Sequence, residues 1–218
     1  MSNNNLKLYF VMRSKVIGGS DPLAVLEGAL KGGVTCFQLR EKGPDALSGA
    51  KLEEFAIQCK SLCKEYGVPF IISGDVDLAV KVGADGIHLE QEEIDFSRVR
   101  EKLGQNMSLG VSVHTASEAF AAADAGASYI EIGPLFESKE KVNRPTAKLE
   151  LIREVAFQLP GLPIVGCGGI TERKMGSVIR AGASCVAVSS VITDAENPEE
   201  AARQLKGQVL LSLTGVEM

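Results

Sequence analysis

GASCVAV (residues 182–188) decides the fold, because the same form occurs at three earlier places in the chain. Each copy has a glycine, a small residue and then a short apolar run. A glycine at the end of a helix can take the left-handed conformation that turns the chain. The repeat therefore predicts a chain that passes from helix to strand in the same way several times. The earlier copies are GGVTCFQL (32–39), GADGIHL (83–89) and GASYIEI (126–132).

Eight short apolar runs extend this pattern over the chain. They are rich in Val and Ile and lack strict polar alternation, as is typical of parallel strands covered on both faces. Helical patterns separate them, with start signals at Asp21-Pro22 and at Thr115 with Glu118. The runs are LYFVM (8–12), CFQLRE (36–41), PFIIS (69–73), GIHLE (86–90), SLGVSV (108–113), YIEIG (129–133), PIVGCG (163–168) and CVAVSS (185–190).

This order of units predicts an α/β protein with one closed (β/α)8 TIM barrel. A doubly wound sheet of about five strands would leave three of the runs unexplained. The length of 218 residues suits one such barrel. We expect a single domain over residues 1–218, with an N-terminal tail at 1–5 and a C-terminal tail at 209–218.

Composition and charge exclude several classes of function. A net charge of −5 argues against a general nucleic-acid binder, which needs a basic face. The N-terminus has no signal-peptide pattern, and no apolar run of about 18 residues predicts a membrane span. The five cysteines form no CxxC pair and indicate neither disulfides nor zinc, so we expect a reduced, cytoplasmic protein. A small anionic ligand remains compatible with this charge.

The working face of such a barrel lies just after each strand. Gln38 and Arg40 share one side of their strand by alternation, and Lys42 follows at the rim. An amide, a guanidinium and an ammonium that converge at a barrel mouth suit an oxyanion. Ser112 and His114 follow the fifth strand in the same way.

Two further segments predict contacts to a phosphorylated ligand. Gly168-Gly169 follow the seventh strand, and Ser189-Ser190 follow the eighth, where barrels of this kind often bind phosphate. The loop GPLFESKEK (133–141) after the sixth strand, with Ser138 and Lys141, is expected to close over the ligand.

Together these stretches resemble the thiamine phosphate synthase family over essentially the whole chain. The resemblance is carried by GGVTCFQLREKGPDALSG, GADGIHLEQEE, LGVSVHT, IGPLFESKEK and PIVGCGGI. It implies a transferase of thiamine biosynthesis that joins hydroxymethylpyrimidine diphosphate to hydroxyethylthiazole phosphate and releases pyrophosphate. It also implies Mg²⁺ as cofactor.

The resemblance implies a role for each matching residue. Arg40, Ser112 and Lys141 are the expected catalytic residues. The expected pyrophosphate contacts include Ser112 and Lys141, and the thiazole-phosphate contacts include Gly168, Ser189 and Ser190. The full set expected to bind substrate is Gln38, Leu39, Arg40, Glu41, Lys42, Ser73, Ser112, Ser138, Lys141, Gly168, Gly169, Ser189 and Ser190.

The chain departs from the family pattern at its metal site. Ser73-Gly74 stand where the family usually has Asn-Asp, so one magnesium ligand is replaced by glycine. Glu93 and Asp75 are the remaining candidate ligands. Three added carboxylates, Glu90, Glu131 and Glu140, oppose anion binding unless a cation or a proton intervenes.

Two alternatives stay open at this point. One is a thiazole tautomerase-like isomerase that uses His114, and the other is a non-catalytic protein that binds a phosphorylated ligand. The sequence leaves a homo-oligomer open as well, and it indicates no nucleic-acid or membrane partner.

Overall fold

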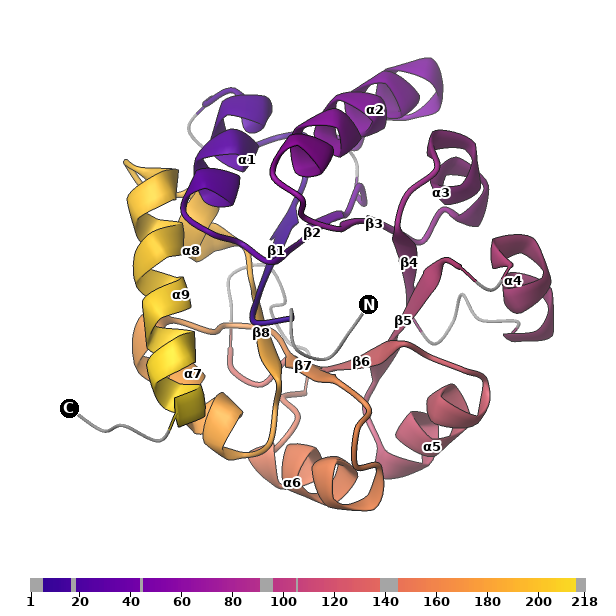
Figure 1. The fold of residues 1–218 in the computed structure, drawn as a ribbon, viewed down its shortest axis with the longest axis vertical. Helices are drawn as coiled ribbons and strands as arrows, with labels where there is room; N and C mark the ends of the chain where they lie inside the picture. The colour runs from indigo at the N-terminus through magenta and orange to yellow at the C-terminus, as the bar shows by residue number, and fades with distance from the viewer. Residues whose placement is uncertain are drawn as a thin grey trace.

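The computed structural model describes residues 6–16, 19–43, 45–90, 96–104, 106–137 and 145–214. Within them, parallel strands form a closed barrel in the order of the sequence, from β1 to β8 (Figure 1). This confirms the expected (β/α)8 fold. The strands are β1 (Leu8–Met12), β2 (Cys36–Leu39), β3 (Phe70–Ser73), β4 (Gly86–Leu89), β5 (Ser108–Val113), β6 (Tyr129–Ile132), β7 (Ile164–Gly166) and β8 (Cys185–Val188).

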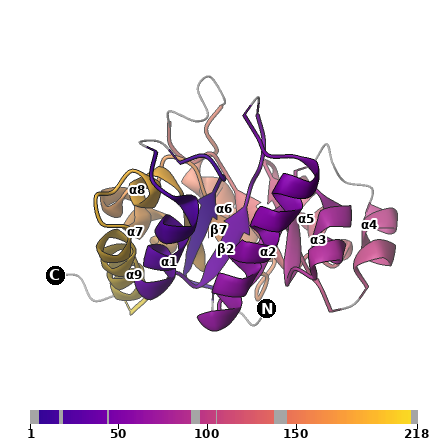
Figure 2. The ribbon, with the colours of Figure 1, turned by 90° about the horizontal axis from the view of Figure 1, so that it is seen from above.

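Helices surround the barrel and lie alongside its strands (Figure 2). Asp21 caps α1 as expected, since its side chain accepts a hydrogen bond of 3.1 Å from the Leu23 N–H. Thr115 caps α5 in the same way through the Glu118 N–H, at 3.2 Å. The helices are α1 (Pro22–Lys31), α2 (Gly49–Glu65), α3 (Val76–Val82), α4 (Phe96–Leu103), α5 (Ala116–Asp124), α6 (Leu149–Gln158), α7 (Glu172–Arg180), α8 (Ser190–Thr193) and α9 (Pro198–Thr214).

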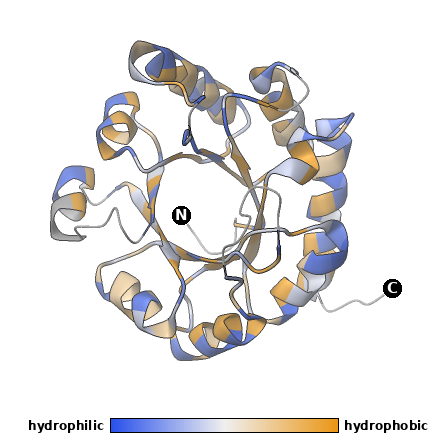
Figure 3. Cartoon of the chain, turned by 180° about the vertical axis from the view of Figure 1, so that it is seen from behind, coloured by the Kyte–Doolittle hydropathy of each residue, from blue (hydrophilic) through white to orange (hydrophobic). Residues whose placement is uncertain are grey.

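Two apolar clusters hold the layers together. The larger one lies between the strands and the surrounding helices, and it contains residues such as Phe37, Ile72 and Val186. The smaller one fills the barrel, with Tyr9, Tyr129 and Val165. Leu6, which precedes β1, belongs to this inner cluster and is buried. Figure 3 shows the mixed hydropathy of the outer helices around the largely apolar strands.

Gly110 on β5 makes room for an aromatic pair inside the barrel. The rings of Tyr9 and Tyr129 enter from β1 and β6, with centroids 5.8 Å apart. A Cβ atom at Gly110 would lie 2.1 Å from Cζ of Tyr129. A larger residue at this position is therefore incompatible with the observed place of the ring.

The strands end slightly earlier than the apolar runs suggest. β7 ends at Gly166 and β8 at Val188. Consequently Gly168, Gly169 and Ser189 stand in the connections that follow, at the mouth of the barrel. The backbone of Gly168 and Gly169 has positive φ angles of 85° and 63°, which favour glycine.

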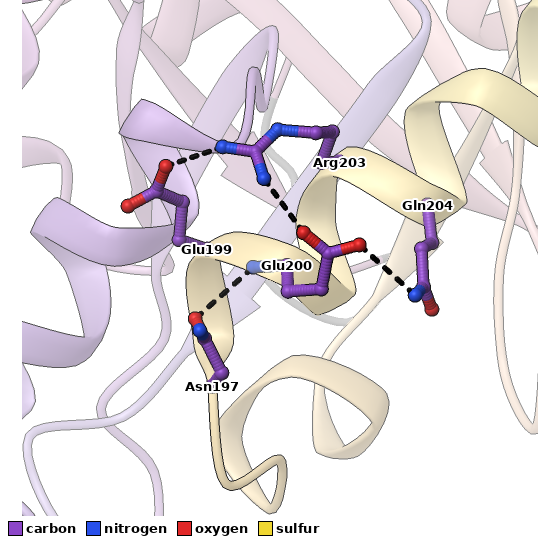
Figure 4. A network of polar contacts seen from close by, with 5 residues as sticks. All are labelled: Asn197, Glu199, Glu200, Arg203 and Gln204. Atoms are coloured by element: carbon purple, nitrogen blue, oxygen red, sulfur yellow. Dashed lines mark hydrogen bonds and ion pairs between the residues drawn. The ribbon is translucent and has the colours of Figure 1, made fainter.

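Helix α9 corrects the expected C-terminal boundary. It continues through residues 209–214, and Val209 is completely buried, so these residues belong to the domain and not to a tail. The Asn197 side chain accepts a hydrogen bond from the Glu200 N–H at 3.1 Å, and Arg203 pairs with Glu199 and Glu200 (Figure 4). Residues 1–5, expected as the other tail, lie outside the described part.

Among the helices of the described residues, none is long and apolar enough to cross a membrane.

Candidate functional site

The mouth of the barrel contains a cavity of about 360 Å³. Residues from β2, β4, β5 and β6 border it on one side, and the connections after β7 and β8 border it on the other. It is lined by Val11, Gln38, Arg40, His88, Glu90, Ser112, Glu131, Glu137, Cys167, Gly168, Gly169, Ile170, Thr171, Lys174, Ala187, Val188, Ser189, Ser190, Val191 and Asp194.

A chain of hydrogen bonds forms the floor of this cavity. The Tyr9 hydroxyl donates to Oε1 of Gln38 at 2.8 Å and lies 2.7 Å from the Tyr129 hydroxyl. The Tyr129 hydroxyl lies 3.3 Å from Nδ1 of His88, whose Nε2 lies 2.9 Å from Oγ of Ser112. Because burial raises the pKa of both phenols, the two tyrosines stay neutral and hold Gln38 and Ser112 in fixed positions.

Arg40 and Lys42 converge, but on a carboxylate of the protein. Oε1 of Glu90, which follows β4, lies 2.8 Å from the Arg40 guanidinium and 3.3 Å from Nζ of Lys42. Partial burial opposes ionisation, yet the hydrogen bond and charge of Arg40, with those of Lys42, lower the pKa of Glu90 to about 2. The cationic end of the site therefore already contains one bound anionic group.

The other end of the cavity is built from backbone, hydroxyls and one cation. Gly168, Gly169, Ser189 and Ser190 all border it. Lys174, on the first turn of α7, donates a hydrogen bond of 3.3 Å to the Gly169 carbonyl and lies 4.7 Å from the centre of the Phe136 ring. Such a set can bind a phosphate group.

Glu131 adds a carboxylate to the lining of this cavity. It pairs in register with Ser112 on β5 and with Val165 on β7, and only 9% of the residue is exposed. No hydrogen bond or ion pair joins its side chain to another described residue.

Several predicted residues line a second, smaller cavity of about 170 Å³ beside β2 and β3. Leu39, Glu41, Lys42, Ser73 and Asp75 are among them. Glu41 accepts hydrogen bonds from the backbone N–H groups of Ser14 and Leu47, so its carboxylate holds the loops together. The predicted substrate-binding residues are thus divided between two neighbouring cavities.

The described residues do not fit magnesium well. The Asp75 carboxylate accepts a hydrogen bond of 2.8 Å from the Leu78 N–H and so caps α3. Gly74, with a φ angle of 83°, offers no ligand, and the buried Ser73 hydroxyl has no hydrogen-bond partner in this part of the chain. No group of three or more His, Cys, Asp or Glu side chains suited to a metal occurs among the residues described.

Some predictions lie outside the described residues or receive no support. Ser138, Glu140, Lys141 and Glu93 fall in segments that the structure does not describe. His114 does not line the cavity: its side chain is about half exposed, and Nδ1 lies 3.4 Å from the Glu118 carboxylate. This position gives no support to an isomerase that uses His114.

Several residues of the site had no place in the predicted set. His88, Glu137 and Lys174 line the cavity, and Tyr9 and Tyr129 support it through hydrogen bonds to Gln38 and His88. The tyrosines could have been found by strand alternation, since Tyr129 lies two residues before Glu131 on the same side of β6. Nothing in the local pattern distinguishes Lys174 from the other lysines on the outer helices.

Comparison with known proteins gives a consistent picture. The family model described as thiamine monophosphate synthase matches residues 8–192. A thiamine-phosphate synthase of Lysinibacillus sphaericus is 44% identical over 201 residues, covering 92% of this chain and 94% of the relative. One of Bacillus mycoides is 45% identical over 212 residues, covering 95% and 94%. Among solved structures, thiamine phosphate pyrophosphorylase from Pyrococcus furiosus has a TM-score of 0.85 at 27% identity, covering 97% of this chain and 98% of that one.

Proposed function

Because the chain belongs to the thiamine monophosphate synthase family, we propose that it joins a pyrimidine diphosphate to a thiazole phosphate and forms thiamine phosphate and pyrophosphate. It is a transferase of thiamine biosynthesis. The observation that carries this proposal is one cavity with the Arg40 guanidinium at one end and a glycine- and serine-lined cup at the other. Such a cavity suits two phosphorylated partners whose reactive ends meet in the middle.

The proposed reaction needs little acid or base. The bond between the pyrimidine methylene carbon and the diphosphate oxygen breaks, and its electron pair leaves with pyrophosphate. The lone pair of the thiazole nitrogen then forms the new carbon–nitrogen bond. The protein has to bind the leaving diphosphate, exclude water and align the two rings.

The residues at the cationic end perform the first of these tasks. Arg40 and Lys42 bind the diphosphate, Arg40 being able to donate two parallel hydrogen bonds. Ser112, held by His88 at 2.9 Å, donates to the same ligand or to the pyrimidine ring. Gln38, held by Tyr9, contacts the pyrimidine. Ser138 and Lys141 remain proposed pyrophosphate contacts.

The opposite end binds thiazole phosphate. Gly168 and Gly169 allow close approach to the backbone, and Ser189 and Ser190 add hydroxyl donors. Lys174 supplies the only positive side chain among the described residues that line this end. Its charge neutralises part of the phosphate.

Magnesium is the cofactor that the family implies, and it would neutralise diphosphate charge when bound. We propose Glu93, with diphosphate oxygens and water, as its ligands, since Mg²⁺ often keeps several waters. Asp75 is less suitable because one of its oxygens caps α3. We therefore expect a weak dependence on Mg²⁺.

The remaining parts of the proposal concern location and assembly. The five cysteines are free and buried, which supports a cytoplasmic protein. The substrates and pyrophosphate are the proposed partners, and a homo-oligomer is compatible with the fold.

A product assay tests this function directly. The purified protein is incubated with both substrates, with and without Mg²⁺, and thiamine phosphate is quantified. Calorimetry with each substrate alone distinguishes catalysis from binding. Binding of both substrates without product would indicate a non-catalytic binding protein, and binding of neither would contradict the proposed site.

A further inference from the structure

Glu131 is a carboxylate that the rest of the fold does not explain. It is nine-tenths buried, it lines the main cavity, and among the described residues no donor or cation bonds to it. A buried carboxylate without a partner is costly. The cavity is therefore the place from which a partner would come.

Two buried groups near Glu131, Tyr129 and Cys185, carry no charge that could pair with it. Burial is the main cause that raises the pKa values of Tyr129 and Cys185, and the nearby charge of Glu131 adds to both. The two described cations that line the cavity have other partners, because Arg40 bonds to Glu90 and Lys174 to the Gly169 carbonyl. A charge in such surroundings acts strongly on a bound ligand, since little water screens it.

The proposed reaction creates a positive charge in this cavity. When the diphosphate leaves, the pyrimidine methylene carbon becomes electron-deficient. When the thiazole nitrogen captures it, the thiazole ring becomes a permanently charged thiazolium. No proton, oxidant or reductant is needed, so Glu131 has no acid–base step to perform.

We propose that Glu131 is the counter-ion of this positive charge, an inference that rests on the proposed function. Its strand β6 lies between β5, which carries Ser112, and β7, which leads to Gly168, and Glu131 lines the cavity in which we place the two rings. It stabilises the electron-deficient carbon and the thiazolium more than the uncharged rings of the two substrates, which is the condition for faster chemistry. Glu131 is thus a further catalytic residue of this chain.

Two ligands with the same phosphate group and different ring charge test the proposal. Hydroxyethylthiazole phosphate has a neutral ring, and thiamine phosphate has a cationic one. In Glu131→Gln, the Kd of thiamine phosphate measured by calorimetry should rise roughly tenfold or more, whereas that of thiazole phosphate should change less than about twofold. In the product assay kcat should fall roughly tenfold at nearly unchanged KM values.

A matched control distinguishes the effect of the buried Glu131 charge from that of any negative charge near the cavity. Glu137→Gln removes one charge from the exposed rim of the same cavity, where water screens it, and should change the ratio of the two Kd values by less than about twofold. Thermal unfolding checks each variant. If Glu131→Gln does not fold, Glu131→Met has a similar length and no charge.

A third experiment uses only the wild-type protein. The wild-type protein should bind thiamine phosphate roughly tenfold more tightly than its deaza analogue, which has a similar shape and a neutral ring. Equal changes in the Kd values of both ligands in Glu131→Gln would overturn the role of Glu131, as would a wild type without preference for the cationic ring. Either result would leave the proposed function intact. If the wild type binds neither ligand, the proposed function fails and this inference with it.

Discussion

The Glu90 carboxylate lies where an anionic ligand is expected, because Arg40 and Lys42 both approach its Oε1 atom. A diphosphate has to displace it or share these cations with it. Glu90→Gln should therefore strengthen the binding of inorganic pyrophosphate, by roughly five- to tenfold since the pair is partly exposed. Titration calorimetry measures this change.

A surface ion pair provides the control. Glu150→Gln removes the same charge from a pair with Arg153 on the exposed face of α6 and should leave pyrophosphate affinity unchanged. Since the pKa of Glu90 is about 2, the difference between wild type and Glu90→Gln should persist from about pH 5 to pH 8. Weaker binding in Glu90→Gln would mean that Glu90 supports the ligand instead of competing with it.

At this scale the sequence predicts partners on one strand better than partners across the barrel. Gln38 and Arg40 line the same cavity because side chains of a strand alternate. The bond between Tyr9 and Tyr129 joins β1 to β6, so it depends on the register of the whole barrel. The ion pair of Glu90 with Arg40 crosses from β4 to β2 and depends on that register too.

At the scale of elements, the contact between β5 and β6 holds the floor of the site. Gly110→Ala would push a methyl group into the Tyr129 ring, with 2.1 Å between Cβ and Cζ. We expect a loss of about 3 kcal/mol in the free energy of unfolding, measured with urea. The displaced ring would also disturb His88 and Ser112 and lower kcat.

Gly207→Ala is the matched control for this change. Gly207 lies in α9, and an added Cβ would meet no atom within 4 Å. It should raise the free energy of unfolding by up to about 1 kcal/mol, because alanine favours a helix. If Gly110→Ala were as stable as the wild type, the barrel interior would be looser than the structure indicates.

Helix α7 contributes the positive charge of Lys174 to the site. Lys174→Met should raise the Kd of thiazole phosphate about three- to tenfold, because it removes the positive side chain that donates a hydrogen bond to the Gly169 carbonyl. Lys64→Met, on the exposed last turn of α2, should have no effect. Calorimetry with thiazole phosphate measures the Kd of both variants. An unchanged Kd in Lys174→Met would exclude Lys174 from the site.

The sequence also predicts element positions better than their limits. All eight strands occur where the apolar runs are, because buried parallel strands need such runs. The residues after β7 are apolar or small for another reason: Cys167 lines the cavity and Gly168 packs against Pro134. Hydrophobicity alone therefore could not distinguish the end of the strand from the start of the site.

At the scale of the whole molecule, α9 joins the first and the last β/α units of the barrel. It packs against α1 and α7, as Figure 1 shows beside the closure of β8 on β1. The approach to α1 is so close that a Cβ at Gly32 would lie 2.3 Å from the Glu199 carbonyl oxygen. The apolar stretch VLLSLT (209–214) is compatible with a helix, but its packing could not be predicted because it depends on neighbouring helices far away in the sequence.

Removal of residues 198–218 should consequently abolish cooperative folding. It deletes the buried side chains of Ala202, Leu205 and Val209 and uncovers the part of α1 that packs on them. Calorimetry should show no sharp thermal transition, and binding of a hydrophobic dye should increase. Asn197→Ala in the full chain removes only the cap of α9 and should cost about 1 kcal/mol, with a sharp transition retained. A truncated chain that still melted sharply, near the wild-type temperature, would mean that the barrel closes without α9.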